Sequence, residues 1–230
     1  MDSSMHSKQL RSFFKYEYEE QTKQYILSGD IAAVEEQAVN YLCALADIPL
    51  SEFVDYIVKN CKREPIMAAD VFQFSDIKDA TINICNVICA KENTGMCFQD
   101  IGQLLLGDGT QRSQTAFNKY GENHIKTAEV LGLAFKTGKR QYYVSSTGIA
   151  FCKLPEETRE KIIVRLVLRN KLFVQLLLVA SNGPFELDAF LYDLSGSTYL
   201  RRRTNIKYVI NLLLASPEFD FSYLANNIIL

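Results

Sequence analysis

The segment "KYGENH", residues 119–124, brings together residue types that could do chemistry. Glu122 and His124 are two residues apart, and a carboxylate with an imidazole could transfer protons or bind a metal ion. Gly121 stands inside a helical pattern, where glycine costs about 1 kcal/mol relative to alanine. The segment raises three hypotheses: an active site, a metal site, or the reading face of a DNA-binding module.

The six cysteines are a second possible source of chemistry. Cys85 and Cys89 are four residues apart, so a helix would place both on one face. A zinc site needs two close pairs of Cys or His, and the chain has only two histidines, His6 and His124. We interpret the cysteines as small buried residues in a reducing compartment, and we expect no metal and no cofactor.

Known catalytic motifs are not found in the sequence. A metal-dependent endonuclease would need an Asp followed by Glu-x-Lys on adjacent strands. The nearest match, "REK" at 159–161, lies in a predicted helix without such an aspartate. There is no P-loop, Gly-x-Ser-x-Gly elbow or zinc-hydrolase motif. The acids Glu186, Asp188 and Asp193 belong to a predicted short amphipathic helix and are expected to be solvated. We predict that the protein is not an enzyme.

Helical periodicity assigns "KYGENH" to an amphipathic helix within residues 110–133. An apolar stripe is formed by Phe117, Tyr120, His124, Ala128 and Leu131. We therefore expect His124 to be a packed imidazole with one satisfied nitrogen, and Gly121 to allow another element to approach closely. The other side carries polar side chains that can reach bases and phosphates, together with Glu122. Because Glu122 and Glu129 dilute its positive charge, an ordinary solvated face is the alternative. The candidate DNA-binding residues here are Gln111, Arg112, Thr115, Asn118, Lys119 and Lys126.

The elements around this helix follow a recognisable order. Residues 1–95 predict an all-helical region with no evident chemistry, because apolar positions repeat at helical spacing, as at Val34, Ala38, Leu42 and Leu45. A short helix after Met96 ends at a Gly-Asp-Gly turn before the helix of residues 110–133. A run of β-formers broken at Thr137-Gly138-Lys139 then predicts a hairpin. Cations at its tip suit contact with phosphates: Lys136, Lys139 and Arg140.

The C-terminal part repeats this order less completely. Three helices are predicted between residues 154 and 196, and a longer one follows a Ser-Gly-Ser turn, with a remnant strand at 218–224. On the long helix, Ile206, Val209, Ile210 and Leu213 face inward, while Arg202 and Arg203 flank that stripe. This helix start has the most concentrated positive charge of the chain. Its candidate DNA-binding residues are Ser197, Thr198, Arg201, Arg202, Arg203, Thr204 and Asn205, with an acid-paired or solvated helix start as the alternative.

We therefore predict a mainly α fold: an N-terminal helical region followed by two winged-helix-like units, the first with a short β-hairpin wing. The expected divisions are 1–95, 96–154 and 155–230. "IGQLLLGDGTQRSQTAFNKYGENHIKTAEVLGL" and "SGSTYLRRRTNIKYVINLL" resemble the tandem winged helix-turn-helix domains of some restriction endonucleases and of bacterial defence and mobile-element proteins. The resemblance covers about residues 95–215. It implies that the helices after "GDGT" and "SGS" are two recognition helices.

Two functions remain open at this point. In the first, the chain is a non-enzymatic module for double-stranded DNA, in a restriction or antiviral defence system, with its N-terminal helices binding a partner or forming a homodimer. In the second, it is a structural subunit that grips protein, like accessory subunits of coiled-coil ATPases. A net charge of −2 gives no overall basicity, which leaves room for a local basic patch. Without a secretory signal or a bilayer-length apolar run, we expect a cytoplasmic protein that does not contact membranes.

Overall fold

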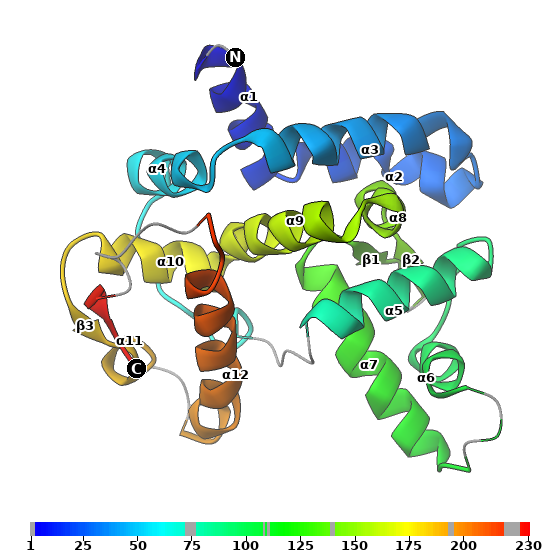
Figure 1. The fold of residues 1–230 in the computed structure, drawn as a ribbon. Coiled ribbons are helices and arrows are strands. Elements are labelled where there is room, and N and C mark those ends of the chain that lie inside the picture. The colour runs from blue at the N-terminus through cyan, green and yellow to red at the C-terminus, as the bar shows by residue number, and fades with distance from the viewer. Residues whose placement is uncertain are drawn as a thin grey trace. The chain divides into compact units, whose positions relative to one another are not determined.

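The computed structural model describes residues 3–71, 77–107, 109, 111–138, 141–192, 196–218 and 226–230. Over these residues the protein is mainly helical, with twelve α-helices and four short strands (Figure 1). The strands form one antiparallel pair, β1 with β2, and one parallel pair, β3 with β4. The prediction of a mainly α fold is confirmed at this level.

The chain forms two compact units, each assembled from separated segments. Unit 1 contains Met1–Arg11, Ala46–Gln73 and Lys161–Leu230, and unit 2 contains Ser12–Leu45 and Phe74–Glu160. Residues 96–154 therefore share a compact unit with part of the N-terminal helical region. The expected divisions at 95 and 154 stay predictions about which segments fold independently.

Three helices have residues in both units: α1 (Ser3–Phe14), α3 (Ala32–Asp47) and α9 (Glu156–Arg169). The other elements of unit 2 are α2 (Glu17–Ser28), α5 (Ile77–Ala90), α6 (Phe98–Leu106), α7 (Gln114–Val130), β1 (Ala134–Lys136), β2 (Tyr142–Val144) and α8 (Ser146–Lys153). Those of unit 1 are α4 (Leu50–Asn60), α10 (Lys171–Ala180), β3 (Phe185–Glu186), α11 (Leu187–Phe190), α12 (Gly196–Leu214) and β4 (Ile228–Ile229).

Helix α3 confirms the predicted apolar stripe, since its buried positions are Val34, Ala38, Leu42 and Leu45. Its start differs from the expected one near Ser28 or Asp30. Ser28 is the last residue of α2, and Gly29 ends that helix with a left-handed φ of 80°. Glycine adopts this conformation without the steric cost that a Cβ would add. The segment expected to start one helix therefore contains the end of α2, followed by the start of α3 at Ala32.

Unit 1 is stabilised by a buried arginine on α9. The Arg165 side chain is 1 % exposed and donates hydrogen bonds to the carbonyl oxygens of Ala46 (3.0 Å), Ile48 (2.7 Å) and Lys161 (3.0 Å). It also forms an ion pair with Glu218 at 2.7 Å. A charge taken out of water needs such partners, so these contacts let one guanidinium join α9 to the end of α3 and to the start of α4.

Candidate nucleic-acid interface

Two glycines set the crossing of α6 and α7. A Cβ atom added at Gly121 would lie 1.9 Å from the carbonyl oxygen of Phe98, and one at Gly102 would lie 2.0 Å from the carbonyl oxygen of Phe117. Only glycine allows the two backbones this close. The close approach predicted for Gly121 is confirmed, and its partner is α6 (Figure 1).

The interior face of α7 agrees with the predicted one at His124, Ala128 and Leu131, which are buried, while Phe117 and Tyr120 are half-buried. His124 Nδ1 donates a hydrogen bond to the Tyr120 carbonyl oxygen at 2.9 Å, one turn earlier in the helix. The imidazole is therefore packed with one nitrogen satisfied, as expected. A catalytic or metal-binding role for this segment gains no support from its geometry.

On the polar face of α7, one carboxylate pairs with two lysines. Lys119 and Lys126 are exposed and contact different oxygens of Glu122, at 3.0 and 2.6 Å. The hydrogen bond from Lys126 is the main cause that lowers the pKa of Glu122 below its ordinary value. Thr115 and Asn118 are exposed on the same half of the helix. This face presents polar donors whose positive charge is partly neutralised from within the helix.

Two of the predicted contact residues lie before α7 rather than on it. The helix begins at Gln114, and the Ser113 side chain accepts a hydrogen bond from the Ala116 N–H as its N-cap. Gln111 and Arg112 are exposed in the segment that leads into the helix. The predicted helix included these two residues, but the N-cap at Ser113 shows that the helix begins after them.

The hairpin β1–β2 follows α7 at the expected place in the chain, and its second strand also pairs with the chain before α6. Met96 and Tyr142 exchange two backbone hydrogen bonds, at 3.1 and 2.9 Å. The Asn93 side chain is buried and acts like a neighbouring strand: its amide group donates to the Val144 carbonyl at 2.9 Å and accepts from the Val144 N–H at 2.8 Å. These hydrogen bonds connect the chain before α6 to β2. Lys136 is exposed at the end of β1, and Lys139 and Arg140 lie outside the described residues.

In the second candidate surface, at the start of α12, one arginine forms an ion pair with an acidic residue. Arg203 donates two hydrogen bonds, both of 2.8 Å, to the Asp188 carboxylate of α11. Asp188 is thus ion-paired and not simply solvated as expected, and the acid-paired alternative holds for Arg203. Arg202 and Asn205 are half-buried and Thr204 is exposed. The side chains of three further candidates in this helix are outside the described part: Ser197, Thr198 and Arg201.

The inward face of α12 agrees with the prediction, since Ile206, Val209, Ile210 and Leu213 are buried. On its other side, Leu200 is 73 % exposed and Tyr208 is 42 % exposed.

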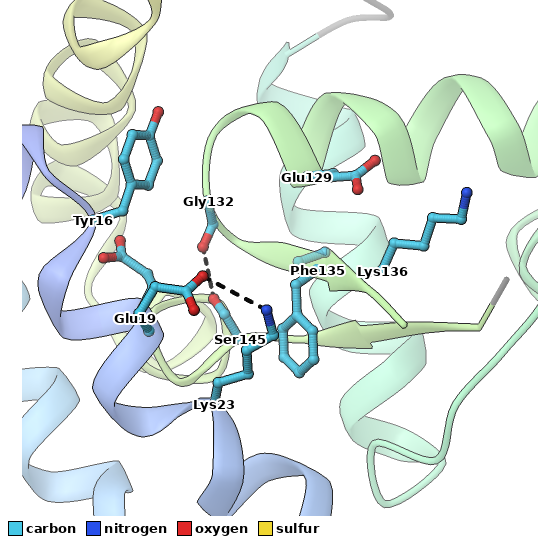
Figure 2. A pocket seen from close by; sticks show the side chains of 10 residues that line it. Tyr16, Glu19, Lys23, Glu129, Gly132, Phe135, Lys136 and Ser145 are labelled. Atoms are coloured by element: carbon cyan, nitrogen blue, oxygen red, sulfur yellow. Dashed lines mark hydrogen bonds and ion pairs between the residues drawn. The ribbon is translucent and has the colours of Figure 1, made fainter. Parts of the chain in front are cut away.

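A cavity of about 260 Å³ lies within unit 2 beside the hairpin β1–β2. Tyr16, Glu19 and Lys23 line it from the N-terminal side, and Glu129 and Phe135 from the end of α7 and from β1 (Figure 2). The Lys23 ammonium lies 5.3 Å from the centre of the Phe135 ring. Sequence periodicity gave no sign of this cavity, because it joins segments more than a hundred residues apart.

We expect replacement of Glu129 by glutamine to stabilise the protein at neutral pH. Burial raises the pKa of Glu129 above its ordinary value of 4.5, against the lowering effect of Lys136 and Lys126. The protonated form therefore favours folding, and this contribution is complete below the unfolded pKa and lost as the pH rises through the folded pKa. Glutamine has no charge that burial would desolvate. Its gain in folding stability over glutamate should therefore be present near pH 7 and absent near pH 4.

Urea unfolding at both pH values measures this effect, with Glu36→Gln on the exposed side of α3 as the control. An equal gain at the two pH values, or an equal gain in the control, would contradict the role of Glu129.

The cysteines differ from the interpretation made from the sequence. Cys85 is buried, whereas Cys97 is exposed and the other four are intermediate. Within the described ranges no group of three or more His, Cys, Asp and Glu side chains is arranged to hold a metal ion. No helix among the same residues has the length and apolar character needed to cross a membrane.

Comparison of this chain with protein-family models, with curated proteins and with solved structures finds no match. The case for a function therefore depends on the residues and their geometry.

Proposed function

We propose that the protein is a non-enzymatic DNA-binding protein in which α7 enters the major groove of duplex DNA. The observation that carries the proposal is the order α5, Met96 bridge, α6, α7, β1, β2, with the polar first half of α7 exposed. In a winged helix, the second helix of the helix-turn-helix reads base edges, and the hairpin contacts the adjacent backbone. The glycine crossing supports the proposal because it fixes α7 against α6 without using the exposed face.

The proposal assigns different tasks to the exposed side chains of unit 2. Thr115 and Asn118 would approach base edges, since hydroxyl and amide groups can donate to and accept from bases. Arg112, Lys119 and Lys126 would contact phosphates, which supply most of the affinity and carry no sequence information. A role as the recognition subunit of a bacterial defence or restriction system, in the cytoplasm, belongs to the same proposal and rests on the resemblance of the two sequence stretches.

A salt titration tests the proposal directly. We expect a fluorescent duplex to bind at about 50 mM salt and to lose most of its affinity by about 200 mM, because bound phosphates release counterions. The Lys119→Ala/Lys126→Ala double variant should reduce the slope of log affinity against log salt by about 2, one for each phosphate contact.

The control is Lys59→Ala on α4. Lys59 is exposed and pairs with Asp55 four residues away at 2.9 Å, so it has the same type of ion pair as Lys126 with Glu122. The absence of duplex binding by the wild type at low salt, or an equal loss in the Lys59 variant, would overturn the proposal.

A specific observation favours a protein-gripping role as the second candidate, and it concerns α12. Its exposed face carries Leu200 and Tyr208, and Arg203 is occupied by Asp188. The Arg201→Ala/Arg202→Ala/Arg203→Ala triple variant separates the two functions for this helix. A loss of duplex affinity assigns α12 to DNA, and unchanged binding beside a loss in the α7 variant assigns it to a protein partner. The N-terminal helices, where Met5 of α1 is 54 % exposed, are proposed to bind a partner or a second copy.

A further inference from the structure

One acidic residue stands at the centre of the proposed DNA-contacting face. Glu122 lies between Lys119, three residues before it, and Lys126, four residues after it. Each of its two carboxylate oxygens accepts from a different ammonium group, at 3.0 Å from Lys119 and 2.6 Å from Lys126. The Glu122 side chain is 27 % exposed, compared with 62 % and 48 % for the two lysines. The two cations therefore converge on one anion at the surface of α7.

The arrangement is fixed relative to α6 as well as within α7. The Lys126 ammonium lies 5.7 Å from the centre of the Phe98 ring, at the first residue of α6, where the ring face attracts a cation. Hydrogen bonding from both lysines also keeps the Glu122 pKa below its ordinary value, so the carboxylate is ionised at any pH at which the protein would bind DNA. The pair of cations is thus already occupied when DNA approaches.

We infer that the Glu122 carboxylate stands in for a DNA phosphate between Lys119 and Lys126, and that it sets the affinity of α7 for duplex. A backbone phosphate offers the same features as the carboxylate: a negative charge and two oxygens that can each accept from one ammonium group. Binding then exchanges one anion for another. Each lysine that turns to a phosphate gives up its pair with Glu122, and the carboxylate left behind repels the DNA backbone. This inference rests on the proposed DNA-binding function and names how that same site is regulated.

The test is the duplex affinity of Glu122→Gln, measured by fluorescence anisotropy at about 50 mM salt. Glutamine keeps the shape of the side chain and removes its charge, so both lysines become available. Because an exposed helical ion pair of this spacing contributes about 0.3–0.5 kcal/mol, releasing both pairs should raise the affinity about three- to fivefold. The control Glu36→Gln removes the same charge from an exposed position on α3 in the same unit and should change the affinity less than about twofold.

A second pair of variants locates the effect. The gain from Glu122→Gln should largely disappear in a Lys119→Met/Lys126→Met background, because the gain comes from releasing these lysines. Circular dichroism melting of each variant verifies that the fold is retained. If the wild type binds duplex and Glu122→Gln binds no tighter, this inference is overturned but the DNA-binding function is not. An equal gain with and without the lysines also overturns it. Failure of both wild type and Glu122→Gln to bind at low salt overturns the DNA-binding function itself.

Discussion

Replacement of Arg165 by alanine is expected to destabilise unit 1 by about 3–5 kcal/mol, the cost of breaking a buried ion pair by removing one partner. The side chain is 1 % exposed, and its loss would leave the carbonyls of Ala46 and Ile48 without this donor. Glu218 would lose its 2.7 Å pair, with Lys161 remaining at 4.0 Å. Desolvated acceptors without donors are the main source of this cost.

Hydrogen exchange measured peptide by peptide is the appropriate measurement, because the chain has two compact units and one unfolding curve need not report on both. Peptides from α4 and α10 should exchange faster in Arg165→Ala, whereas peptides from α6 and α7 should change much less. The control Lys59→Ala removes an exposed ion pair of unit 1 and should cost less than about 1 kcal/mol. Equal effects of the two substitutions, or faster exchange confined to unit 2, would contradict the role of Arg165.

Replacement of Gly121 by alanine is expected to destabilise unit 2 by about 3 kcal/mol or more, at the upper end of the cost of overpacking. Helix propensity alone would favour alanine by about 1 kcal/mol, so the sign of the effect decides between local preference and packing. Packing should win, because the new Cβ would lie 1.9 Å from the Phe98 carbonyl oxygen, a backbone atom that moves only if α6 moves.

The matched control for Gly121→Ala is Gly138→Ala in the same unit, where an added Cβ would meet nothing within 4 Å. Hydrogen exchange of peptides from α6 and α7 gives the difference in unit 2, and we expect the Gly138 variant to stay within about 0.5 kcal/mol of wild type. If α7 contacts DNA, Gly121→Ala should also weaken duplex binding although it changes no exposed residue. A Gly121→Ala variant as stable as wild type would show that α6 and α7 can separate freely.

The sequence predicts the elements whose signals are local. The apolar stripe of α3, the end of α6 at Gly107 and the hairpin after α7 follow from signals within short windows. The burial of His124 follows in the same way, because a helical wheel needs only the residues of one helix. These features are set by periodicity and by turn residues, both of which can be counted along the chain.

Features that depend on pairing between distant segments were not predicted. The double hydrogen bond of Asn93 with Val144 spans 51 residues, and the partner of Arg203 is in another helix. Helix α8 was also not predicted, although Ser145 caps it by accepting from the Gly148 N–H at 3.0 Å. By contrast, the pairs of Glu122 were predictable, since spacings of three and four residues place side chains together on a helix.

The segment composition of the two units implies an order of assembly during synthesis. Unit 2 has its last residue at Glu160, so all of its parts have been made while the C-terminal seventy residues are still to be added. Unit 1 combines residues 1–11 and 46–73 with the chain from Lys161 onward, so its early segments cannot complete the unit until that later part has been made. Its early segments, including Phe53 and Ile57 of α4, must stay uncovered until α9 and α10 emerge. Once residues up to Glu160 have emerged from the ribosome, the chain would therefore have all segments of unit 2 available, while apolar surface from unit 1 is exposed to aggregation and to chaperones.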